Sequence, residues 1–72
     1  MKVHFDEKAD AVYLRLDDSP IIGSEEVSPG VVLDYNEKND VVGVEILRVK
    51  GRIRPESLNQ IQLEVVRGQE QP

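Results

Sequence analysis

Residues 3–16 read VHFDEKADAVYLRL, and residues 33–46 read LDYNEKNDVVGVEI. The second stretch repeats the pattern of the first at a constant offset of thirty residues, without a gap. Phe5 corresponds to Tyr35, and the Glu-Lys pair of the polar loop occurs in both copies. We therefore expect one structural unit to occur twice in the chain.

Each copy has the pattern of a β-hairpin. Apolar and polar residues alternate on both sides of a short polar loop, as in Val12, Leu14 and Leu16 after the first loop. Alternation with period two is typical of a strand with one buried face, and Asp and Asn suit tight turns. Asn39 suits a positive φ better than Ala9 at the equivalent position, so the two turns should differ in detail. The repeat predicts hairpins over about residues 2–16 and 31–47, either packed side by side or joined into one sheet.

The segment between the two hairpins predicts an edge strand. Residues 21–27, IIGSEEV, are followed by Pro29 and Gly30, and Pro-Gly is a strong turn signal. We therefore expect a further antiparallel hairpin over residues 21–35. Its first strand carries Glu25 and Glu26, and charge on an edge strand discourages association between sheets.

The C-terminal extension, residues 48–72, has a different pattern. Pro55 and Ser57 indicate a helix start, which predicts a short helix near residues 55–60. The following IQLEVV favours a strand over residues 61–66, although a helix would also place Leu58, Ile61 and Val65 on one face. The last residues, GQEQP, should be frayed. The predicted fold is α+β and mostly β: one domain, 1–72, with a small antiparallel sheet from two pseudo-repeated hairpins, a short C-terminal helix and a possible last strand.

Composition leads us to expect self-association. A chain of 72 residues buries a small core, and without cysteine it has no disulfide or thiolate metal site to stabilise it. A homodimer would supply the missing burial, with Ile61, Leu63 and Val65 as the expected interface. No secretory signal and no apolar run of membrane-spanning length occurs in the sequence, so we expect a cytoplasmic protein without membrane contact.

The acidic residues could be read as metal ligands or as catalytic groups. The loops at residues 6–10 and 36–40 are rich in carboxylates, but each carries a lysine and neither has the calcium-loop pattern. The pairs at residues 17–18 and 25–26 are adjacent in sequence, and neighbouring strand residues point to opposite faces. His4 should point away from the core, and no second histidine exists for a catalytic triad. We expect solvated turns, no enzymatic activity, no metal and no cofactor.

A basic run, RVKGRIR, is the strongest candidate for a contact with another molecule. Arg48, Lys50, Arg52 and Arg54 are spaced two apart, so on an extended strand they would form one stripe. Such a stripe could dock an acidic partner or contact phosphates of a nucleic acid, or it could simply balance nearby acids. The net charge of −5 and the scarcity of aromatic residues make nucleic acid the less favoured partner.

The stretches FDEKADAVYLRL and SEEVSPGVVLDYNEKNDVVGVEIL, with their spacing, resemble the small bacterial and archaeal domain of unknown function numbered 2283. The resemblance covers about residues 2–49. It implies a compact β-rich domain with no established enzymatic activity, and the antitoxin-like partner of a small toxin-like protein is a role that it makes plausible. The expected function is a non-enzymatic, homodimeric interaction module, and the alternative is a nucleic-acid-binding regulator that uses residues 48–54.

Overall fold

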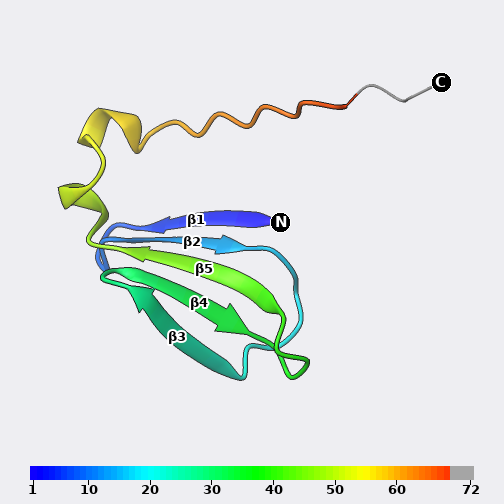
Figure 1. Cartoon of the computed structure of the whole chain (residues 1–72). Coiled ribbons are helices and arrows are strands. Elements are labelled where there is room, and N and C mark those ends of the chain that lie inside the picture. Colours follow the sequence, from blue (N-terminus) through cyan, green and yellow to red (C-terminus); the bar gives the residue numbers. More distant parts are fainter. Residues whose placement is uncertain (69–72) are drawn as a thin grey trace.

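A computed structural model describes residues 1–68, and residues 69–72, which belong to the end expected to fray, lie outside the described residues. The chain forms five strands in sequence (Figure 1): β1 (Lys2–Asp6), β2 (Ala11–Arg15), β3 (Gly23–Ser28), β4 (Val31–Tyr35) and β5 (Val41–Leu47). They form one antiparallel sheet in the order β1-β2-β5-β4-β3. The expected mostly β fold is therefore confirmed, and the hairpins join into one sheet.

The sequence repeat appears in the sheet as an approximate twofold symmetry. Hairpin β1–β2 and hairpin β4–β5 meet through pairing of β2 with β5, which are equivalent strands of the repeat. Leu14 lies opposite Val44, its own counterpart thirty residues later. The pseudo-twofold axis therefore passes through this pair at the middle of the sheet.

The two repeated turns differ, as expected. In the first turn the Asp6 carboxylate accepts a hydrogen bond from the Ala9 backbone at 3.0 Å, and Asp10 takes the positive φ of 54°. In the second turn the Asn36 side chain accepts two backbone hydrogen bonds, and Asn39 takes the positive φ of 65°. Asp and Asn tolerate this conformation because their short polar side chains can hydrogen-bond locally, which Ala cannot do, so the left-handed position moves one residue later in the first turn.

The hairpin predicted between the repeats is confirmed. Strands β3 and β4 pair through the turn at Pro29 and Gly30, and Gly30 has the positive φ of 78° that such a turn requires. The register shifts between Glu26 and Ser28, which marks a β-bulge. Strand β3 is an edge of the sheet and is exposed throughout its length, as expected for a charged edge strand.

The C-terminal region differs from its prediction. Within residues 1–68 the helical segments are the two 3₁₀ turns η1 (Val49–Gly51) and η2 (Pro55–Ser57), and the predicted helix over residues 55–60 is not found. Leu58 donates a backbone hydrogen bond to the Pro55 carbonyl, which closes a single turn. Residues 61–68 are exposed and belong to no strand, so the predicted last strand is not formed within this chain. None of the helical segments in the described range is long and apolar enough to cross a membrane.

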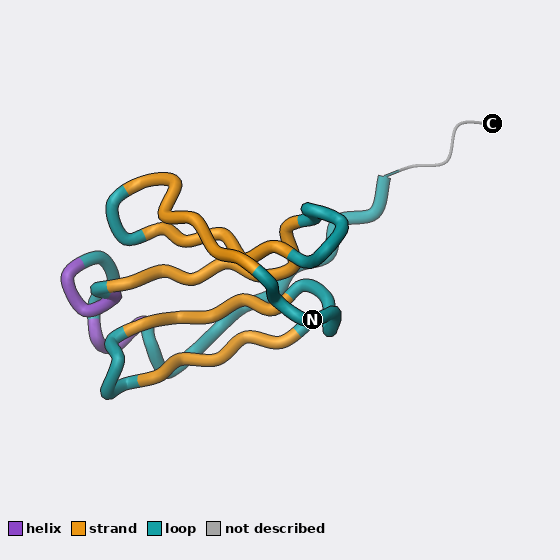
Figure 2. Tube along the Cα trace, turned by 90° about the horizontal axis from the view of Figure 1, so that it is seen from below, coloured by secondary structure: helices purple, strands orange, loops and turns teal. Residues whose placement is uncertain are grey.

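Within residues 1–68, no second layer of secondary structure covers the sheet. Figure 2 shows the helical turns gathered at one end of the sheet rather than over a face. Among the described residues, the fully buried apolar side chains are those of Ala11, Val42 and Val49. Stable domains usually bury a sheet face against another layer. A five-stranded sheet with so small a core therefore leaves most of its apolar face open.

Candidate interaction surfaces

One face of the sheet is apolar and only partly covered. Residues opposite one another on antiparallel strands point to the same face, and the strand register places a continuous set of apolar side chains there. We call this set the apolar face: Val3, Phe5, Val12, Leu14, Val31, Leu33, Val44 and Ile46. Val3 is 42% exposed, and the other seven members are half-buried. A contiguous apolar patch that stays partly exposed is typical of a binding surface.

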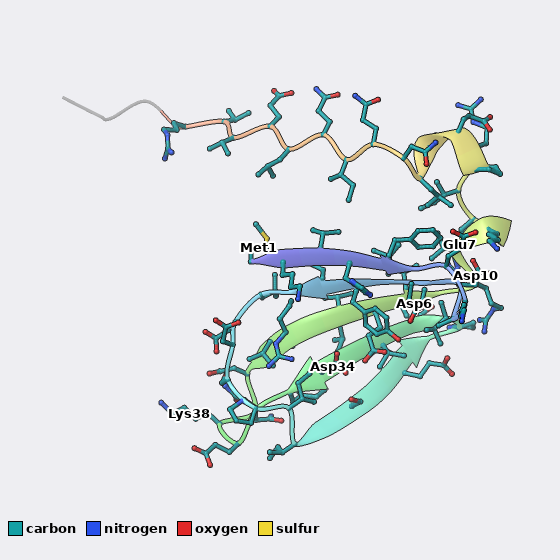
Figure 3. All side chains as sticks on the ribbon, turned by 180° about the vertical axis from the view of Figure 1, so that it is seen from behind. Met1, Asp6, Glu7, Asp10, Asp34 and Lys38 are labelled. Carbon is teal, nitrogen blue, oxygen red and sulfur yellow. The ribbon has the colours of Figure 1, made fainter. Side chains whose placement is uncertain are left out.

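The opposite face is polar, and a carboxyl pair lies at its centre. The Asp34 side chain is only 4% exposed, and it accepts a hydrogen bond from the Ser24 hydroxyl at 2.6 Å. Figure 3 shows Asp34 in the middle of the sheet, well away from the labelled turn residues. Gly43 lies opposite Asp34 on β5, and a β-carbon there would be 2.9 Å from the Asp34 carboxylate oxygen. The absence of a side chain at Gly43 therefore makes room for Asp34.

Glu45 completes the pair and has an altered acidity. A hydrogen bond with Asp34, partial burial and the charge of Asp34 together raise the pKa of Glu45 to about 7, from 4.5. Like charges brought together favour the form that keeps one proton. Glu45 therefore keeps its proton at higher pH than an ordinary glutamate does.

A shallow cavity of about 330 Å³ lies beside this pair on the polar face. Its lining includes Lys2, His4, Tyr13 and Asp34. The His4 and Tyr13 rings face each other at a centroid distance of 6.2 Å, and His4 points away from the apolar face, as expected. Arg15 is engaged elsewhere, because its Nε donates to the Asp17 carbonyl at 2.6 Å. The cavity thus combines a carboxyl group with two aromatic rings and a lysine.

Sequence reasoning did not identify the carboxyl pair. Asp34 and Glu45 are eleven positions apart and come from different strands. A signal was present in Gly43, because glycine inside a strand often marks a close approach by a neighbouring group. Which group approaches Gly43 depends on the pairing of β4 with β5.

The two acidic loops do not form one site. Figure 3 shows Glu7 and Asp10 at one end of the sheet and Lys38 at the other. This separation follows from the topology, because β1 and β4 run in opposite directions and each loop follows one of them. Within residues 1–68, no three His, Cys, Asp or Glu side chains are placed so that they could hold a metal ion.

The acidic residues at 17–18 form a turn, as expected. The Asp17 carboxylate accepts hydrogen bonds from the backbone and the hydroxyl of Ser19. These bonds hold the pKa of Asp17 below its usual value. Asp17 also lines a cavity of about 520 Å³ between this turn and the loop at residues 36–40, where Asn36 donates to the Ser19 hydroxyl at 3.2 Å. The carboxylate therefore stabilises local backbone structure.

The basic residues do not lie on an extended strand. Arg48 has a left-handed backbone, and the 3₁₀ turn η1 follows it, so the regular spacing of two does not produce a stripe. The Arg52 guanidinium donates to the carbonyls of Leu47 and Pro29, and the guanidinium groups of Arg48 and Arg52 both lie over Gly30. Their contact with a partner or nucleic acid stays a prediction, whereas the extended geometry behind it was wrong.

The expected dimer-interface residues are exposed. Ile61, Leu63 and Val65 lie in the segment after η2, with exposures of 67%, 73% and 62%. The segment leaves the sheet near β1, because Leu58 and Phe5 line a common cavity of about 210 Å³. Figure 1 shows it running past β1 without joining the sheet. A use for these side chains as an interface stays a prediction.

Comparison with known proteins gives one match. The family described as "Protein of unknown function (DUF2283)" matches over residues 2–50, which covers all five strands. Neither a curated protein nor a solved structure matches the chain.

Proposed function

The chain belongs to the DUF2283 family, whose description assigns no activity, and we propose that it is a non-enzymatic interaction module that works as a homodimer. The observation that carries this proposal is the incompletely covered apolar face of a single-layer sheet. Burying apolar surface contributes about 25 cal/mol per Å², so covering this face is the main stabilisation still available to the chain. A second copy presents the same apolar face and can cover it symmetrically.

Size measurements at several concentrations test the dimer. We expect a mass of twice the 8.1 kDa of one chain at micromolar concentration. Leu33→Gln, on the apolar face, should weaken the dimer, while Glu25→Gln, on the exposed edge strand β3, should leave it unchanged. A full-length chain that stays monomeric at high micromolar concentration would contradict the proposal.

For the finer role, we propose a small basic, toxin-like protein as the partner that the module neutralises. The family resemblance makes this role plausible, and the net charge of −5 favours a basic partner. The C-terminal extension is the part proposed to reach this partner through its exposed apolar side chains, while the acidic residues of the sheet supply the charge complementarity.

An affinity pull-down from the native lysate, with and without nuclease, tests this role. A stoichiometric small basic protein that survives nuclease, and that a chain lacking residues 52–72 fails to capture, is the expected result. Recovery of the second copy alone would remove the neutralising role and leave the homodimer. Partners that disappear with nuclease would indicate nucleic acid, and their binding should then weaken steeply with salt.

A further inference from the structure

The outer edge of β1 is an unfilled position in the pseudo-symmetric sheet. The approximate twofold axis relates β1 to β4, and β3 pairs antiparallel with the outer edge of β4. Among the described residues, no strand pairs with the corresponding edge of β1. One more strand there would give a six-stranded sheet in which both repeats have the same neighbours.

The structure of β1 protects its outer edge against further pairing less than the structure of β3 protects the opposite edge of the sheet. A partner strand would protect the edge of β1. Strand β3 carries Glu25 and Glu26 and a β-bulge, devices that discourage further pairing. Strand β1 pairs with β2 in an unbroken register from Lys2 to Asp6, with Val3 42% exposed. A regular, half-apolar edge of this kind is a template for strand addition.

The segment at residues 61–66 has the form of the missing strand. Ile61, Leu63 and Val65 alternate with Gln62 and Glu64, so an extended segment has one apolar side and one side that is polar up to Val66. Its six residues are close in length to the five residues of β1. The segment makes no backbone hydrogen bond to the sheet of its own chain among the described residues. Each chain thus presents an unpaired edge of β1 and an unpaired segment with the sequence pattern of a strand.

We propose that residues 61–66 of one copy pair antiparallel with the outer edge of β1 in a second copy, and that the two copies exchange these segments reciprocally. This inference rests on the homodimer proposed above and adds a strand exchange to the contact between the two apolar faces. Reciprocal exchange fills both edges and closes the assembly as a dimer. It also continues each apolar face by one strand.

Charge and side-chain size select one register for this pairing. Leu63 placed opposite Val3 puts Ile61 opposite Phe5 on the apolar face and Glu64 opposite Lys2 on the polar face. Opposite charges and apolar pairs directly across two strands are stabilising, whereas a shift by one residue would move every apolar side chain to the polar face. The register therefore pairs apolar side chains on the apolar face and opposite charges on the polar face.

Cysteine cross-linking tests the exchange directly, because the chain has no cysteine of its own. Chains carrying only Val3→Cys are mixed with chains carrying only Leu63→Cys and oxidised, so that a disulfide between the two variants must join different chains. We expect a covalent dimer of the two variants. Mixing the Val3→Cys chain with a Gln62→Cys chain is the matched control. Residue 62 points to the other face, so this mixture should give no covalent dimer of the two variants.

A charge reversal gives an independent test without cysteine. The symmetric dimer contains this pair twice, so Lys2→Glu should raise the dimer dissociation constant by up to about twenty-five-fold, the square of the roughly fivefold effect of one cross-strand charge pair. Adding Glu64→Lys to the same chain should restore the dimer, whereas Glu56→Lys, outside the proposed strand, should not. Failure of Glu64→Lys to rescue would overturn the register.

The outcomes separate this inference from the proposed homodimer. A Val3→Cys, Leu63→Cys double variant that closes only within single chains would place the segment on its own β1 and overturn the exchange. If the chains form a dimer but the Val3→Cys and Leu63→Cys variants do not cross-link, the exchange is overturned and the homodimer remains. A chain that is monomeric throughout would overturn both.

Discussion

At the scale of single residues, the two repeats differ most on the polar face. Gly43 and Asp34 of the second repeat correspond to Tyr13 and His4 of the first. In the first repeat the two rings face each other, whereas in the second the carboxyl group of Asp34 lies over the bare backbone of Gly43. Because Gly43 has no side chain, the polar face has space at this position for the buried carboxyl group of Asp34.

Gly43→Ala should destabilise the fold. The added β-carbon would lie 2.9 Å from the Asp34 carboxylate, which is held in place by Ser24. Overpacking of this kind costs about 1–3 kcal/mol. Urea denaturation measures it, and Gly23→Ala, with no atom within 4 Å of its added carbon, is the control that should stay close to wild type. Equal stability of the two variants would show that Asp34 moves freely.

The raised acidity of Glu45 predicts a pH-dependent stability. Its pKa is about 7 in the folded protein against 4.5 for the free side chain, so the folded state binds the proton more tightly than the unfolded state does. The free energy of unfolding should therefore fall as the pH rises from about 4.5 through about 7. Because Glu45 is only partly buried, solvent screening should reduce the loss to on the order of 1 kcal/mol rather than the full value of the shift.

Denaturation of Glu45→Gln at pH 5 and pH 8 checks this prediction. The variant should lose this fall in stability, because glutamine cannot ionise beside Asp34. Glu25→Gln, on the exposed edge strand, is the matched control and should keep the wild-type pH dependence. The same slope in Glu45→Gln as in wild type would assign the pH dependence to another group.

At the scale of elements, the turn between β3 and β4 connects two parts of the chain. Gly30 has a left-handed backbone, its carbonyl accepts a hydrogen bond from Leu47 at 2.8 Å, and its amide donates to the Glu26 carboxylate. The guanidinium groups of Arg48 and Arg52 cover it. The turn therefore fixes the start of the C-terminal extension as well as the hairpin.

Gly30→Ala should weaken this hairpin. An L-residue in the left-handed region costs about 1–2 kcal/mol, and the new β-carbon would displace the two guanidinium groups. Thermal unfolding measures the loss, with Gly51→Ala as a control because its added carbon meets nothing within 4 Å. A Gly30→Ala variant as stable as wild type would show that the turn readily adopts another conformation.

At the scale of the whole molecule, stability should depend on association. A single-layer sheet with a small core has little apolar burial of its own, and residues 61–66 add exposed apolar side chains. Covering these surfaces in a dimer couples folding to association. Folding and assembly should therefore respond together to protein concentration.

The unfolding midpoint of the full chain should rise with protein concentration. The triple variant Ile61→Ser, Leu63→Ser, Val65→Ser should lose most of this dependence, because it removes the apolar side of the segment. Gln62→Ser, on the polar side of the same segment, should keep it. A full-length midpoint independent of concentration would indicate a stable monomer.

Local patterns in the sequence were enough to predict the local structure. Period-two alternation and the turn residues identified both repeated hairpins, the Pro29-Gly30 turn and the charged edge strand, because each depends on residues close together in the chain. The helix predicted near residues 55–60 does not form, although its start signal at Pro55 is local. The turn η2 buries none of its residues, so packing does not stabilise a helix longer than one turn there.

Tertiary structure alone decided which strands of the two hairpins pair and where this pairing places the loops and the edges of the sheet. The β2–β5 pairing sets the strand order, places the acidic loops at opposite ends of the sheet and leaves the edge of β1 unfilled. Within the predicted hairpin of β4 and β5, the register of the two strands brings Glu45 beside Asp34. Alternation in a strand records which residues share a face but not which strand lies beside it, because that choice depends on contacts between residues distant in the chain.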